Sequence, residues 1–153
     1  MKDATWRTAA LLLLAGLAGA AQAQGCSPSN RLSAGQIGTL LNGNTICVGG
    51  GSGWEYQEQH RAAGGGAPAT AAMTSGALVD YKRGPGHPTD PTKVVGSWSI
   101  SGSFGSSASV VHNYGAGGSY TYSVHGSGAV GSVHMLCGPT TVSALIQPGQ
   151  GGC

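Results

Sequence analysis

Residues typical of β-strands recur in short runs along the chain, and glycine separates most of the runs. Each run is rich in valine, tyrosine, tryptophan, threonine or serine, which is typical of strands bounded by turns. The pattern predicts eight strands, at residues 44–49, 54–61, 77–83, 94–102, 108–114, 119–125, 131–137 and 140–147. Such a series indicates an all-β fold, either a small antiparallel up-and-down barrel or a sandwich.

One short helix is predicted before the first strand. Ser33 can cap residues 34–41, and Asn42-Gly43 offers a left-handed end to the helix. Beyond this segment the helical period is lost. Hairpin-length connections at 115–118, 126–130 and 138–139 predict an antiparallel meander in the C-terminal half.

A short helix followed by eight successive strands is similar to the architecture of lipocalin-like and avidin-like up-and-down barrels. Gly96-Ser97-Trp98 also resembles the G-x-W motif of lipocalins, although that motif opens the first strand there and the fourth predicted strand here. The resemblance is one of architecture, and it implies a barrel without implying a ligand.

The N-terminus has the pattern of an export signal. Lys2 and Arg7 precede an apolar run over residues 9–21, and Ala21-Gln22-Ala23 provides small residues for signal peptidase. We therefore predict a signal peptide at 1–23 and a secreted or periplasmic protein. Lipoprotein processing at Cys26 is the less favoured alternative, because the preceding residues lack the expected leucine. The apolar run is too short for a transmembrane segment.

The predicted mature chain comprises an N-terminal segment at 24–43, which carries the helix, and a single β domain at 44–153. Two longer interruptions fall within this domain. Residues 62–76 are rich in glycine and alanine and predict a flexible loop. Residues 84–93 carry prolines at a spacing of three, which predicts a stiff loop or a polyproline II segment for an aromatic groove.

All four cysteines, Cys26, Cys47, Cys137 and Cys153, follow the predicted cleavage site. An even number in an exported chain predicts two disulfides, and the absence of a C-x-x-C pair argues against a redox or zinc-ribbon site. If the first and last strands are neighbours, Cys26 pairs with Cys153 and Cys47 with Cys137. The local alternative pairs Cys26 with Cys47 and Cys137 with Cys153.

Charge is scarce, with seven Lys and Arg, five Asp and Glu, and a net charge of +2. Such a chain offers no strong electrostatic field for nucleic acid. Its composition also differs from that of charge-rich disordered chains. The sequence Gly126–Gly131 fits G-x-G-x-x-G, but a strand and not a helix follows it, so no dinucleotide cofactor is predicted.

The strand predicted at 54–61 carries the strongest candidate site. Alternation places Trp54, Tyr56, Glu58 and His60 on one face. If that face points inward, Glu58 and His60 become polar groups inside a barrel or at its mouth, where such groups often mark binding or acid–base sites. The alternative is that both lie at a solvated strand end.

The next predicted strand adds Asp80 and Lys82 on a shared face, and either can pair with Glu58, His60 or Arg61 across the sheet. We therefore take Trp54, Tyr56, Glu58, His60, Asp80 and Lys82 as candidate ligand-binding residues. A structural ion pair is the simpler interpretation of the charged members. An acid–base dyad of Glu58 or Asp80 with His60 requires contact at about 3 Å.

Histidines and tyrosines gather on the strands of the C-terminal half. A hairpin register that sets Tyr114 opposite Tyr120 and His112 opposite Tyr122 makes one aromatic face, which we interpret as core or sheet surface. His125 then lies on the opposite face from His112. The three histidines of these strands, His112, His125 and His134, therefore do not converge on one ion, and no metal site is predicted.

Three functional hypotheses remain. The first is a small secreted or periplasmic binding module with a small-molecule or protein partner and no cofactor. The second is a structural or surface-assembly subunit that self-associates through strand edges, since few lysines guard them. The third is a small hydrolase or isomerase that uses Glu58, His60 or Asp80. We favour the binding module over the enzyme, because the motifs of the common hydrolases are absent.

Overall fold

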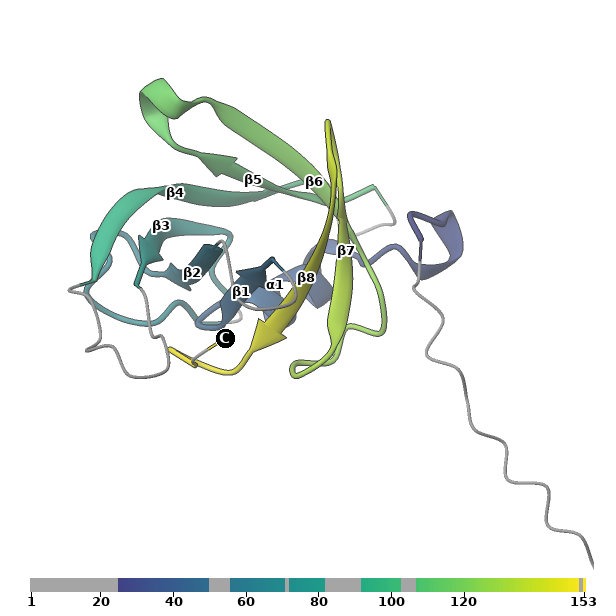
Figure 1. Cartoon of the computed structure of the whole chain (residues 1–153), viewed down its shortest axis with the longest axis horizontal. Helices are drawn as coiled ribbons and strands as arrows, with labels where there is room; N and C mark the ends of the chain where they lie inside the picture. The colour runs from purple at the N-terminus through teal and green to yellow at the C-terminus, as the bar shows by residue number, and fades with distance from the viewer. Residues whose placement is uncertain (1–24, 50–55, 71, 82–91, 103–106, 152) are drawn as a thin grey trace, which may run out of the picture.

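The protein folds as a closed antiparallel β-barrel in a computed structural model that describes residues 25–49, 56–70, 72–81, 92–102, 107–151 and 153 (Figure 1). Eight strands follow one another around the barrel in chain order. They are β1 (Thr45–Val48), β2 (Tyr56–Arg61), β3 (Ser75–Asp80), β4 (Lys93–Ser101), β5 (Ser109–Asn113), β6 (Ser119–His125), β7 (Val133–Cys137) and β8 (Thr141–Gln147). The predicted all-β fold is confirmed, as a barrel and not a sandwich.

The barrel closes where β1 pairs with β8 in antiparallel register, from Thr45 opposite Gln147 to Val48 opposite Ala144. Every strand therefore has a partner on both sides. Closure removes the free edges on which strand addition depends. The hypothesis of an assembly subunit that uses exposed strand edges thus loses its structural basis within the described barrel.

Helix α1 (Ala34–Leu41) packs against the inner face of the barrel at one end. The Ser33 side chain accepts a hydrogen bond from the Gln36 amide, and the Gln36 side chain accepts one from the Ser33 amide, so the helix begins with a capping box. It ends at Leu41, Asn42 is its C-cap residue, and Gly43 follows at φ +77°. Both predicted helix ends are confirmed. Ile37, Leu40 and Leu41 are fully buried against inward side chains of β1 and β5–β8.

Two short 3₁₀ turns complete the described elements, η1 (Pro28–Asn30) before the helix and η2 (Gly115–Gly117) between β5 and β6. A second apolar cluster of Ala69, Leu78 and Trp98 lies beside β3 and β4. The Trp98 indole Nε1 donates to the Arg61 carbonyl at 2.9 Å, so this buried ring has its polar group paired.

The predicted loop at 62–76 ends earlier than expected, because residues 75 and 76 belong to β3. The start of the loop is tied to β2, since Arg61 Nη1 donates to the Gly65 carbonyl at 2.9 Å. Ala69 is buried in the second cluster. Of the predicted loop at 84–93, residues 84–91 lie outside the described part of the chain, and Lys93 already begins β4. The predicted signal peptide at 1–23 also lies outside it.

Both predicted disulfide pairings are wrong: the structure joins Cys26 to Cys137 and Cys47 to Cys153. The N-terminal segment does not run beside the end of β8, as the prediction assumed. It crosses to β6, where the Leu32 amide donates to the Val124 carbonyl at 2.8 Å, and this route brings Cys26 to the end of β7. The chain beyond β8 folds back over the outside of β1, where Thr45 Oγ1 donates to the Gly149 carbonyl at 2.6 Å. That path delivers Cys153 to Cys47.

Peptide mapping of the non-reduced protein is expected to recover two linked pairs, Cys26–Cys137 and Cys47–Cys153. The bonds span 111 and 106 residues, and loops of this length restrict the unfolded chain strongly. The double variant Cys47→Ala/Cys153→Ala should lose about 2–5 kcal/mol of unfolding free energy in urea titration. Recovery of a Cys26–Cys47 peptide would contradict this topology.

Gly76→Ala should destabilise the barrel by about 2 kcal/mol or more, because there is no room for the new methyl group. A Cβ atom at Gly76 would lie 1.9 Å from the Arg61 carbonyl oxygen and 2.9 Å from Trp98 Nε1. Gly66→Ala is the matched control, since a Cβ there meets nothing within 4 Å. Equal urea midpoints for the two variants would show that β2 and β3 do not approach as closely as described.

Candidate functional site

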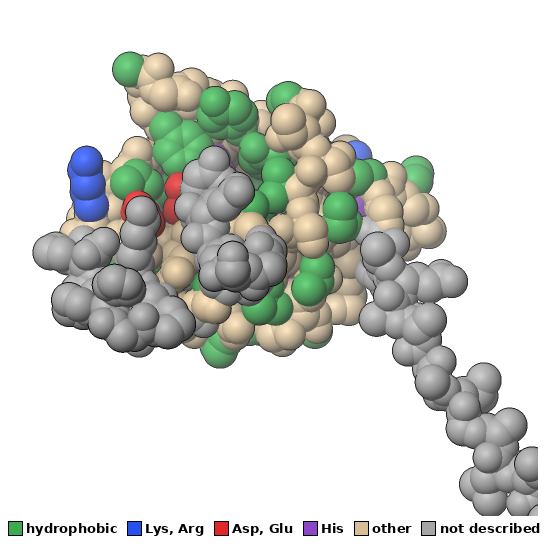
Figure 2. Space-filling model, in the orientation of Figure 1, with side chains coloured by type: hydrophobic (Ala, Val, Ile, Leu, Met, Phe, Trp, Pro, Cys, Tyr) green, Lys and Arg blue, Asp and Glu red, His purple; other side chains and the backbone are tan. Residues whose placement is uncertain are grey.

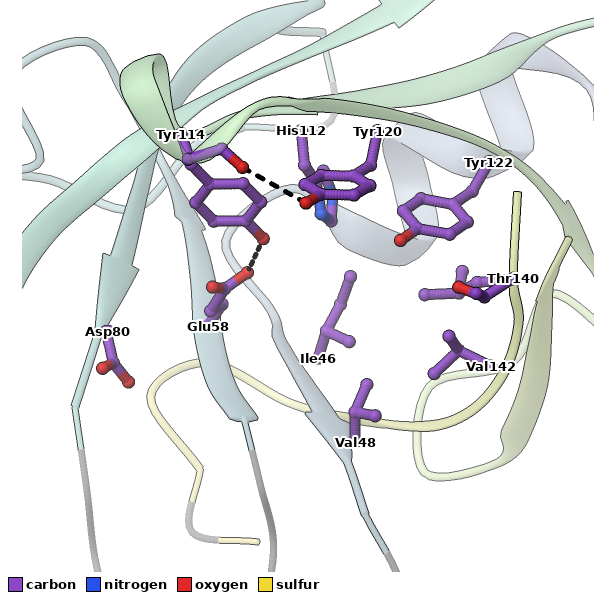
Figure 3. Close-up of a pocket in the computed structure, with 12 residues that line it drawn as sticks. Ile46, Val48, Glu58, Asp80, His112, Tyr114, Tyr120, Tyr122, Thr140 and Val142 are labelled. Carbon is purple, nitrogen blue, oxygen red and sulfur yellow. Dashed lines mark hydrogen bonds between the residues drawn. The ribbon is translucent and has the colours of Figure 1, made fainter. Parts of the chain in front are cut away.

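A cavity of about 510 Å³ opens at the mouth of the barrel (Figure 3). The residues that line it come from β1, β2, β3 and β5–β8 and the turns beside them: Ile46, Val48, Glu58, Asp80, His112, Tyr114, Gly117, Tyr120, Tyr122, Leu136, Thr140 and Val142. Its floor, at Ile46 and Leu136, belongs to the apolar cluster that contains the helix. The cavity therefore opens away from α1, which occupies the other end of the barrel.

Strand alternation and register bring the lining residues together. Ile46 on β1 lies opposite Glu58 on β2, and Glu58 lies opposite Asp80 on β3. Residues directly opposite in antiparallel strands share a face, so all three project to the inside. Glu58 therefore points inward, which is one of the two orientations that the sequence left open, and Asp80 joins it at the same wall of the cavity (Figure 3).

Glu58 is a buried carboxyl held by a phenol. Tyr114 donates its hydroxyl hydrogen to Glu58 Oε2 at 2.7 Å. Burial raises the pKa of Glu58 above its usual value, the Tyr114 hydrogen bond lowers it in part, and the neighbouring Asp80 raises it again. Because burial is the largest of these effects, Glu58 retains its proton to a higher pH than a solvated glutamate does.

Tyrosines line the side of the cavity formed by β5 and β6. The rings of Tyr114 and Tyr120 stand 6.0 Å apart between centroids with their planes inclined at 61°, and Tyr122 follows on the same face of β6. The Tyr120 hydroxyl donates to the Gly117 carbonyl at 3.2 Å, which ties its ring to the hairpin turn (Figure 3). Their ring faces and hydroxyls give this wall both apolar and polar surface.

The aromatic face was predicted, but its register was wrong by two residues. His112 lies opposite Tyr120 and Val110 opposite Tyr122, because the turn begins at Tyr114 and includes η2. A shift of two residues preserves the face on which each side chain lies. His112 and the three tyrosines therefore still share the inside of the barrel. The sequence interpretation left them as core or sheet surface and omitted them from the site.

His60 and His112 form a buried pair at the base of the cavity, and only His112 is among the lining residues. Their Nε2 atoms lie 3.2 Å apart, and the His60 ring packs 5.4 Å from the Trp98 ring between centroids. Burial lowers the pKa of His60 well below 6.5, and the nearby His112 lowers it further. Burial lowers the pKa of His112 to about 4. Both rings are thus neutral at pH 7, and one Nε2–H donates to the other nitrogen.

The acid–base dyad of His60 with Glu58 or Asp80, the alternative to a structural ion pair, is not formed. Glu58 is bonded to Tyr114, whereas His60 is bonded to His112 and lies outside the cavity lining. His60 Nδ1 is buried without a hydrogen-bond partner among the described residues. This is tolerable if Nδ1 is the unprotonated nitrogen, because His60 then donates through Nε2 and leaves only a weak acceptor unpaired.

Of the six predicted site residues, the structure places Glu58 and Asp80 on the cavity wall and His60 beneath it. Trp54 and Lys82 lie outside the described residues, as does the side chain of Tyr56, whose backbone pairs with Val48. The structure adds Tyr114, Tyr120 and Tyr122. The sequence signal that could have identified them is strand alternation, which places them on the same face as His112. In a closed barrel that face lines the interior.

The other two histidines of the C-terminal strands hold chain segments in place. His125 points outward, as predicted, and its Nδ1 donates to the Ser27 carbonyl at 2.8 Å, which anchors the N-terminal segment. His134 accepts a hydrogen bond at Nε2 from the Gly128 amide at 3.1 Å. No three potential metal ligands converge within the described part of the chain.

Comparison of the chain with protein-family models, with curated proteins and with solved structures finds no match. Among the described residues, no helix has the length and apolar character needed to cross a membrane.

Acid should destabilise the barrel through the buried histidine pair. A pKa of about 4 for folded His112 against 6.5 unfolded means that the unfolded chain binds more protons below pH 6.5. The unfolding free energy should therefore fall as the pH is lowered from about 6.5 to 4, with about 3 kcal/mol attributable to His112 at 1.36 kcal/mol per pKa unit.

Urea titrations across this pH range should show a shallower loss of stability for His112→Gln, which retains a polar side chain but does not titrate. Thr121→Val changes an exposed β6 residue and serves as the control. Identical pH slopes for wild type and His112→Gln would remove His112 as a source of the acid sensitivity.

Proposed function

We propose that this protein is an exported binding module that holds a small ligand in the cavity at the mouth of its barrel. The observation that carries the proposal is the cavity of about 510 Å³, which lies within the range of small-molecule sites. A closed barrel supports such a site because its wall is continuous around the ligand.

The chemistry of the wall supports an amphipathic ligand. Ile46, Val48, Leu136 and Val142 offer apolar surface, and three phenols and two carboxyls offer polar groups at fixed positions. Binding sites combine in this way a mostly apolar surface, which supplies affinity, with a few polar groups that orient the ligand. The three tyrosines also contribute large contact areas with few rotatable bonds.

Export is the second part of the proposal. The pattern at residues 1–23 is that of a signal peptide, and disulfides persist mainly in secreted and periplasmic proteins. We infer that the chain works outside the cytoplasm, where the two bonds stay oxidised.

Binding is favoured over the other two hypotheses on geometric grounds. A hydrolase or isomerase built on Glu58, His60 and Asp80 needs these groups around one reacting atom, but His60 lies beneath the cavity and is bonded to His112. An assembly subunit needs free strand edges, and each strand of the barrel is paired on both sides.

Filling the cavity should abolish binding. Screening a fragment library that contains neutral, cationic and anionic compounds by ligand-observed NMR should give hits that also raise the unfolding temperature. Val142→Trp places an indole in the cavity and should eliminate these hits. Val133→Trp is the matched control, because Val133 is 59% exposed and does not line the cavity. A screen in which no hit depends on Val142 would refute the proposed function.

A further inference from the structure

We propose that the ligand of the mouth cavity is an organic cation, a substituted or quaternary ammonium group on a small apolar body. This inference rests on the proposed function and names its ligand class. It comes from the juxtaposition of two carboxyl side chains with three tyrosine rings around one apolar-floored cavity (Figure 3).

The carboxyl side chains form one wall. Glu58 and Asp80 are register partners on β2 and β3, and both line the cavity. Like charges directly opposite one another in a sheet destabilise it, unless a counter-charge lies between them or one carboxyl is protonated. Among the described lining residues there is no lysine or arginine. A bound cation would supply the counter-charge.

Lys93 is the one described basic residue next to this wall. It is the register partner of Asp80 on β4, at the very start of that strand. Its side chain is exposed and does not line the cavity. Solvated pairs of this kind contribute little energy. Among the described residues, the cavity itself therefore holds no basic side chain. On the face shown in Figure 2, red carboxyl side chains lie beside green hydrophobic ones.

The tyrosines form the second wall. A ring face carries partial negative charge and attracts a cation within about 6 Å of its centroid. Tyr114 and Tyr120 meet edge to face at 61° and do not form a closed stack. The Tyr114 hydroxyl bonds to Glu58, so the aromatic wall and the carboxyl wall join at this hydrogen bond. A cation at the junction can contact both walls.

The floor suits the remainder of such a ligand. Ile46, Val48 and Val142 present aliphatic side chains inside the cavity. A quaternary ammonium has no N–H to donate, so aliphatic and aromatic surface receives its methyl groups without leaving a hydrogen-bond donor unpaired. A strongly hydrated metal ion would instead need a ring of oxygen ligands, and an anion would face two carboxyl groups.

The pH dependence of binding provides an independent test for a cationic ligand. Burial and Asp80 favour the protonated form of Glu58, whereas a bound cation favours the ionised form. Binding should therefore release protons and strengthen as the pH rises through the Glu58 titration. Among the described residues, the other groups that face this carboxyl are Asp80 on β3 and Tyr114 just after β5, with neutral His112 beside them and Lys93 at the rim.

The test is a pair of isosteres, acetylcholine and its uncharged carbon analogue 3,3-dimethylbutyl acetate, titrated into the intact protein by calorimetry. The two differ in charge and hardly in shape. The ammonium ester should bind at least about tenfold more tightly. Glu58→Gln and Asp80→Asn should each reduce that ratio severalfold, and ammonium binding should weaken toward lower pH in wild type.

Tyr120 provides a control that does not depend on buried charge. Its side chain is 39% exposed, so substitution leaves the barrel intact. Tyr120→Phe retains a ring face and should keep the preference for acetylcholine, whereas Tyr120→Leu should reduce it. Equal losses in both variants would assign the effect to the hydroxyl and would overturn the role of the ring.

The outcomes separate this inference from the proposed function. If the neutral ester binds as tightly as acetylcholine, the cation proposal is overturned and a ligand-binding cavity remains. The same holds if fragments bind in a manner that depends on Val142 but none is a cation that binds more tightly than its neutral isostere. If no compound of either kind depends on Val142, both proposals are refuted together.

Discussion

The pairing of β1 with β8 is the constraint on which the rest of the structure depends. It joins the first strand to the last over four residue pairs and converts a meander into a closed wall. Because side chains alternate, closure commits one half of each strand to the interior. Ile46 is the register partner of both Glu58 and Ile146, so the same residue touches the carboxyl wall and the apolar end. Without closure, Glu58 and Tyr114 would belong to separate parts of an open sheet.

The interior changes character along the barrel axis. The end beside α1 is built mainly of buried aliphatic residues, which supply most of the hydrophobic stabilisation. His60 and His112 occupy the middle as a neutral pair that satisfies one nitrogen of each ring. Carboxyls and phenols follow at the mouth, within reach of solvent. This order places the side chains that are most costly to bury nearest to water. The apolar core that stabilises the fold is thereby separate from the polar groups of the cavity.

The local pattern of the sequence was sufficient for the elements but not for their connections. Each predicted strand range contains or overlaps one observed strand, and Ser33 and Gly43 bound the helix as expected, since caps and turns are encoded by neighbouring residues. The prediction of the disulfide pairing was wrong because the pairing depends on where residues 25–33 cross the barrel. Long-range hydrogen bonds of Leu32 and His125 determine that path. The aromatic wall was recognised as a face but not as a site, because a sheet face becomes a cavity wall only after closure.

The disulfides also bear on the cavity itself. Cys47 lies between Ile46 and Val48 on β1, and Cys137 follows Leu136 on β7, so each bond fastens the outside of a strand whose inner side chains line the cavity. A wall fixed from outside loses less freedom when a ligand binds, and the affinity is correspondingly greater. The two bonds therefore restrain, from the outside, strands whose inner side chains form the cavity wall.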